Sequence, residues 1–163
     1  MKWDTLFSMQ QQLDTYILDN QQLSADHVFD KKYLALLVEL GELANETRCF
    51  KFWSTKEKSE KNVILEEYVD NIHFLLSLGL EKGYAFSEIE VAPFEADVSE
   101  TAAFNHLYTL CVAFYSDQTK ANYLALFKAY LQLGQLLGFS EHDLKQAYYD
   151  KNEVNYERQQ TGY

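Results

Sequence analysis

Four acidic side chains in two apolar segments have the types and the spacing of a metal site. Glu39 and Glu42 lie three residues apart within LLVELGEL, and Glu67 and Asp70 repeat this spacing within ILEEYVDNIHFLLSLGL. Side chains three or four residues apart share one face of a helix. Unpaired carboxylates are costly in apolar surroundings, and divalent cations between them remove that cost. Such oxygen ligands favour Mg²⁺, or Mn²⁺ as a substitute, and hydrolysis of a phosphate compound.

Other interpretations of these acids remain open at this point. A solvent-facing helix can carry a Glu-x-x-Glu pair without any metal, and Glu66 beside Glu67 illustrates how ordinary acid-rich helices are. Asp70 and His73 also form Asp-x-x-His, whereas di-iron bundles use two Glu-x-x-His motifs with further glutamates. Since only one such motif is present, His73 is expected to pack or to form a hydrogen bond, and di-iron is the weaker hypothesis.

A succession of helices must position these acids. Apolar residues recur with the helical period nearly throughout, and six glycines and one proline are too few for a sheet of many strands. The pattern predicts an all-α chain. Its helices are expected near residues 3–19, 29–47, 59–82, 98–115, 118–137 and 140–157. Ser140 and Gly138 supply start and stop signals, and residues 1–163 are expected to form one domain.

Charge and composition restrict the partners. The net charge is −11, which repels duplex nucleic acid but allows a small phosphate compound bound with metal ions. No apolar run approaches the roughly 20 residues of a membrane span, and the first residues lack the apolar core of a signal peptide. Cys49 and Cys111 stand in unrelated contexts, which predicts free thiols and a cytoplasmic protein.

These motifs, in this order, resemble the dimeric, all-α dUTP diphosphatases, relatives of the MazG-like nucleotide pyrophosphohydrolases. ELGELANETRCFKFWS followed by EEYVDNIHFLLSLGLE matches their Glu-x-x-Glu, spacer, Glu-x-x-Asp signature. The ending KNEVNYERQQTGY resembles the K-N-x-x-N-x-x-R-Q-x-x-G-Y ending of this branch, and MQQQLD resembles its uracil-recognition motif. The resemblance spans residues 6–163. It implies a MazG-like helical bundle, a homodimer, and hydrolysis of dUTP and dUDP to dUMP.

The resemblance also implies roles for the matched residues. The four acids would hold Mg²⁺, and Glu39 or Glu42 would take the proton of the attacking water. Trp53 would stack on uracil, and Phe74 would form the wall against deoxyribose. The complete set implied to contact the nucleotide is Gln10, Asp14, Lys51, Trp53, His73, Phe74, Lys151, Asn155, Arg158 and Tyr163.

Several of these residues have simpler interpretations. Trp53 and Phe74 could belong to the core, and Lys151 and Arg158 could lie on a surface helix whose C-terminal end favours positive charge. Asp14 departs from the family pattern, because many members carry Asn there. Ionised Asp only accepts hydrogen bonds, whereas Asn also donates them. Asp14 could still accept from the N3–H of uracil.

Two alternative functions remain at this stage. The chain could be a MazG-like pyrophosphohydrolase of another nucleoside triphosphate, which product assays with dUTP and the four standard dNTPs would distinguish. A phage-derived member could also bind a regulatory protein through its dimer surface. The presence of all four acids argues against a role without catalysis.

Overall fold

The computed structural model describes residues 1–94 and 97–163, and this part of the chain folds into α-helices without a strand. The helices are α1 (Asp4–Gln21), α2 (Phe29–Thr47), α3 (Lys61–Lys82), α4 (Glu100–Ser116), α5 (Lys120–Leu136) and α6 (Glu141–Thr161), with a 3₁₀ turn, η1 (Ala25–His27), before α2. The prediction of an all-α chain is confirmed for these residues. Among them, no helix is both long enough and apolar enough to cross a bilayer.

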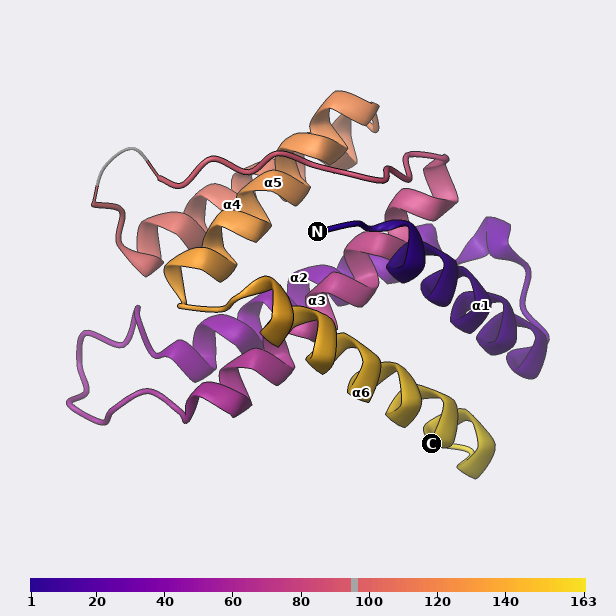
Figure 1. Cartoon of the computed structure of the whole chain (residues 1–163), viewed down its shortest axis with the longest axis horizontal. Helices are drawn as coiled ribbons and strands as arrows, with labels where there is room; N and C mark the ends of the chain where they lie inside the picture. Colours follow the sequence, from indigo (N-terminus) through magenta and orange to yellow (C-terminus); the bar gives the residue numbers. More distant parts are fainter. Residues whose placement is uncertain (95–96) are drawn as a thin grey trace.

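Helix α3 lies at the centre of the arrangement. It packs along α2 and also contacts α1, α5 and α6 (Figure 1). Helices α4 and α5 pair on one side of α2 and α3, while α1 and α6 lie together on another side. The C-terminal helix α6 is therefore brought beside α1 and α3, which come much earlier in the chain.

Capping residues explain where the helices begin and end. Ser140 forms a capping box with Asp143 at the start of α6, which confirms the predicted boundary. Helix α3 ends at Gly83, where φ is 72°, a left-handed conformation that favours glycine. The last helix was expected to end near residue 157. It continues to Thr161 because good helix formers follow residue 157 and the left-handed Gly162 ends it there.

Close packing between α3 and α5 fixes the rotation of α3. The rings of Tyr68 and Tyr130 stack with centroids 4.6 Å apart, and each hydroxyl donates a hydrogen bond to the other residue's carbonyl oxygen. The absence of a side chain at Gly134 leaves room for the Tyr68 ring. Because Tyr68 follows Glu67 directly, this buried contact holds the acidic face of α3 towards α2.

Candidate active site

The packing of α2 against α3 brings acidic side chains together. One carboxylate oxygen from each of Glu39, Glu67 and Asp70 lies within 4.8 Å of the others. Glu39 comes from α2 and the other two from successive turns of α3. Glu42 is exposed and lies outside this group of three, but its charge acts on both Glu39 and Glu67. The structure thus brings three of the four predicted acids together and leaves Glu42 outside them.

The electrostatics of this acidic cluster, Glu39, Glu67 and Asp70, show that its charges are not fully compensated. Burial, followed by the charges of Asp70, Glu42 and Glu67, raises the pKa of Glu39 to about 7. Burial and then Asp70 and Glu42 also raise the pKa of Glu67. A cation between side chains that repel one another in this way favours their ionised forms.

Lys151 on α6 supplies one positive charge to the cluster. Its Nζ lies 2.8 Å from Oδ2 of Asp70 and 3.3 Å from Oε1 of Glu66. Burial lowers the pKa of Lys151, but the hydrogen bonds and charges of these two acids outweigh burial and raise it. Burial raises the pKa of Asp70, and Lys151 opposes that rise. One lysine cannot neutralise three carboxylates, so the site retains an excess of negative charge.

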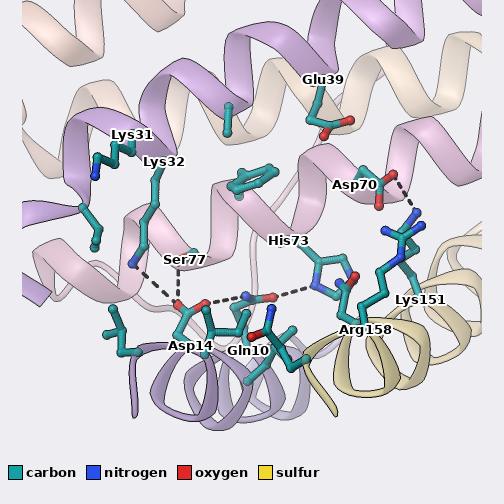
Figure 2. A pocket seen from close by; sticks show the side chains of 18 of the residues that line it. Gln10, Asp14, Lys31, Lys32, Glu39, Asp70, His73, Ser77, Lys151 and Arg158 are labelled. Atoms are coloured by element: carbon teal, nitrogen blue, oxygen red, sulfur yellow. Dashed lines mark hydrogen bonds and ion pairs between the residues drawn. The ribbon is translucent and has the colours of Figure 1, made fainter. Parts of the chain in front are cut away.

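A cavity of about 470 Å³ extends from this cluster between α1, α2, α3 and α6. Figure 2 shows Glu39, Asp70, Lys151 and Arg158 at one end of it, and Lys31, Lys32 and Asp14 at the other. The predicted residues that line the cavity are Gln10, Asp14, Glu39, Asp70, His73, Phe74, Lys151, Asn155, Arg158 and Tyr163. The cavity therefore joins an acidic end with two neighbouring cations to an end with hydrogen-bonding groups.

Hydrogen bonds organise the second end. Nε2 of Gln10 donates to Oδ1 of Asp14 over 2.8 Å, and Oγ of Ser77 donates to Oδ2 over 2.6 Å. Oε1 of Gln10 accepts from the Tyr148 hydroxyl over 2.9 Å and lies 2.7 Å from Nδ1 of His73. Burial raises the pKa of Asp14, and the hydrogen bond from Ser77 is the largest influence that opposes the rise.

His73 is a buried, neutral member of this network. Its ring stacks on Tyr148 with centroids 4.2 Å apart, and burial together with Lys151 lowers its pKa to about 3. Because the amide oxygen of Gln10 can only accept, Nδ1 of His73 carries the proton of the bond between them. This agrees with the expectation that His73 packs and forms a hydrogen bond, and it leaves the carboxylate oxygens of the acidic cluster as the candidate metal ligands.

Four predicted site residues do not line the cavity: the acids Glu42 and Glu67, and also Lys51 and Trp53. Lys51 and Trp53 belong to the segment between α2 and α3, and neither lines the cavity. The Trp53 ring is 65% exposed and meets Phe52 edge to face with centroids 5.1 Å apart. This rules out a place in the core for Trp53, while its contact with a base stays a prediction.

Four polar lining residues were not singled out in the sequence: Lys31, Lys32, Ser77 and Gln159. Lys32 and Glu39 are seven residues apart on α2, and so are Asp70 and Ser77 on α3, a spacing that returns to nearly the same helix face. This repeat is the signal that could have identified Lys32 and Ser77.

Comparison with known families agrees with this geometry. A family model described as dUTPase matches residues 2–163. No curated protein matches the sequence at a significant level.

Proposed function

The chain belongs to the dUTPase family and is an enzyme that hydrolyses dUTP and dUDP to dUMP, and we propose that it does so with Mg²⁺ held by Glu39, Glu42, Glu67 and Asp70. The observation that carries this proposal is the approach of three carboxylate oxygens to within 4.8 Å at one end of the cavity. Pyrophosphate is the second product from dUTP.

The acidic cluster fits a magnesium site. Its donors are carboxylate oxygens, which Mg²⁺ prefers, and the raised pKa values of Glu39 and Glu67 indicate negative charge in excess of what Lys151 balances. Bound there, Mg²⁺ would lower the pKa of a water and neutralise phosphate oxygens. Mn²⁺ has similar ligand preferences and is expected to substitute.

The chain's own residues bind and orient the nucleotide in this proposal. Lys151 and Arg158 lie beside the acidic end, where their N–H groups can donate to phosphate oxygens. Glu39 accepts the proton of the attacking water through a carboxylate oxygen not engaged with the metal, and Glu42 is the alternative. Phe74, which also lines the cavity, packs against deoxyribose.

The remaining predicted contacts follow from position along the cavity. Gln10 and Asp14 lie at the end remote from the acids, where the base would sit. Asn155 lines the same cavity from α6. Tyr163, which follows the Gly162 cap of that helix, lines it as well. The roles of Lys51 and Trp53 stay predictions from the sequence, because neither lines the cavity of a single chain.

A homodimer with a MazG-like bundle in each protomer is part of the proposal. Leu34 and Val38 lie one turn apart on α2 and are exposed, as are Val112 and Tyr115 on the neighbouring α4. Exposed apolar side chains on adjacent helices are typical of an interface. Light scattering over a dilution series tests this point, and a stable monomer at micromolar concentration would contradict it.

Pyrophosphate release from dUTP, with Mg²⁺ and with EDTA, tests the proposed metal dependence. We expect Glu67→Gln to lower turnover by at least about 100-fold, the scale on which one electrostatic group acts at a reaction centre. Glu153→Gln is the matched control, since Glu153 is an exposed acid on α6 that belongs neither to the cluster nor to the cavity lining. Full turnover in EDTA, or equal losses in both variants, would remove the metal assignment.

A further inference from the structure

A row of three polar side chains crosses the end of the cavity that is remote from the acidic cluster. Gln10 and Asp14 come from α1 and Lys32 from α2. Nε2 of Gln10 lies 2.8 Å from Oδ1 of Asp14, and Nζ of Lys32 lies 3.9 Å from Oδ2. Figure 2 shows them in the order Lys32, Asp14, Gln10, with Gln10 nearest to His73 and the acidic end.

Asp14, at the centre of this row, presents acceptors. Ser77, Gln10 and Lys32 all direct donors at its carboxylate, a set of partners that suits the ionised form. The carboxylate also fixes the Gln10 amide. If the amide were reversed, its oxygen would face the acceptors of Asp14, and its N–H₂ would replace the oxygen that accepts from the Tyr148 hydroxyl. Gln10 therefore presents N–H groups beside Asp14, one of them not used by the carboxylate.

Lys32 keeps donor capacity for a ligand. Its ammonium has three N–H groups, and its short contact is with Oε2 of Glu81 at 2.9 Å. The 3.9 Å separation from Asp14 is an ion pair and is too long for a hydrogen bond. Lys32 lines the cavity, whereas Glu81 does not. Glu81 thus binds the Lys32 ammonium without itself lining the cavity.

The row offers donor, acceptor, donor, which is complementary to the O2, N3–H, O4 edge of uracil. We propose that Lys32 is a specificity-determining residue, which donates to O4 of the base while Asp14 accepts from N3–H and Gln10 donates to O2; this rests on the proposed dUTPase function. The direction follows from the cavity: O2 is next to the glycosidic nitrogen, and the sugar and phosphates must extend towards the acidic end. O4 then faces Lys32.

Cytosine fails in this arrangement at two positions. Its N3 is a lone pair facing the Asp14 carboxylate, and its amino group is a donor facing the Lys32 ammonium. Groups left without partners in this way produce strong rejection, since a site built to hydrogen-bond a substrate discriminates more than an apolar one. Lys32 also supplies the donor that an Asn side chain would offer and that Asp14 cannot.

The test pairs a change in the protein with a change in one ligand atom. Calorimetry measures the affinity of dUMP, 4-thio-dUMP and 2-thio-dUMP for the wild type and for Lys32→Met, which keeps the aliphatic stem but has no donor. In the wild type, sulfur at position 4 should weaken binding about tenfold, the scale of one hydrogen bond to a charged group. In Lys32→Met that difference should fall below twofold, while any effect of sulfur at position 2 persists.

The control and the remaining outcomes make the test decisive. Lys128→Met removes the same charge from an exposed lysine on α5 that does not line the cavity, and it should keep the wild-type preference for dUTP over dCTP in kcat/KM. Lys32→Met should lower that preference at least tenfold. A penalty for 4-thio-dUMP that survives in Lys32→Met, or is absent in the wild type, overturns the proposal; the latter holds even if the variant does not fold. If the wild type releases pyrophosphate from dUTP but shows no penalty for 4-thio-dUMP, only the role of Lys32 is refuted. If the wild type does not hydrolyse dUTP, the proposed function is refuted as well.

Discussion

Replacement of Glu39 by Gln should make the metal-free protein more stable at alkaline pH. Glu39 lies against Asp70, Glu42 and Glu67, and burial together with these charges raises its pKa from 4.5 to about 7. A raised carboxylate pKa means that the ionised form is disfavoured in the folded state. Gln has nearly the same shape but no charge, so Glu39→Gln removes this unfavourable term and leaves the packing of α2 on α3 in place.

The size of the effect follows from the pKa change. A rise from 4.5 to about 7 would correspond to about 3 kcal/mol above pH 7 if the interaction were fully buried. Glu39 is partly exposed, and solvent screening reduces the figure. We expect about 1 kcal/mol, which corresponds to a Tm increase of roughly 2–4 °C for a chain of this length. The gain should vanish as the pH falls below 4.5, where Glu39 is protonated in both the folded and the unfolded state, and it should grow as the pH rises from 4.5 to about 7.

Thermal unfolding followed by circular dichroism, in EDTA at pH 5 and pH 8, measures this effect. Glu153→Gln is the matched control, because Glu153 is an exposed acid on α6 and its replacement changes the net charge of −11 equally. Mg²⁺ should stabilise the wild type more than Glu39→Gln, since the variant has lost a ligand. An unchanged Tm at pH 8, or an equal increase in the control, would refute the argument that the acidic cluster stores repulsion.

Three further outcomes are expected. Gly134→Ala should destabilise the protein by about 1–3 kcal/mol in urea, because its Cβ would overlap Tyr68, and Gly41→Ala should cost less because its nearest neighbour, the Tyr108 hydroxyl, would lie at 3.3 Å. Arg158→Ala should lower kcat/KM for dUTP and leave the Mn²⁺ affinity, measured by electron paramagnetic resonance, within twofold of wild type. NMR should show His73 neutral from pH 8 to pH 5, since burial lowers its pKa to about 3, and a midpoint near 6.5 would refute the buried network.

Local patterns in the sequence predicted the helices well. Helix α2 spans residues 29–47 as expected, and the capping signal at Ser140 marks the start of α6. These features depend on neighbours within one turn, so the sequence contains them directly. The end of α6 was placed too early because nothing in the sequence before Gly162 breaks the helix. The left-handed backbone conformation of Gly162, with φ at 76°, became evident only in the structure.

The acidic cluster could be predicted because both pairs lie on single helices. A spacing of three residues determines that Glu67 and Asp70 share a face, and only the packing of α2 against α3 had to be assumed. The placement of Glu42 outside the group of three could not be predicted in this way. It depends on the rotation of α2 about its axis, which packing between helices determines. The position of Trp53 depends on the path of a segment without regular structure, for which the sequence has no periodic signal.

The base end of the cavity was the hardest part to predict, because its chemistry depends on contacts between helices. Asp14 taken alone suggests a lost donor, since a carboxylate cannot replace the N–H of Asn. The structure places the Lys32 ammonium beside that carboxylate, 18 residues later in the sequence and on another helix. The ion pair with Glu81, 49 residues further on, keeps it there. Asp14, which departs from the family motif, is thus accompanied by a donor from a second helix, Lys32. Only the packing of α1, α2 and α3 brings these two side chains together.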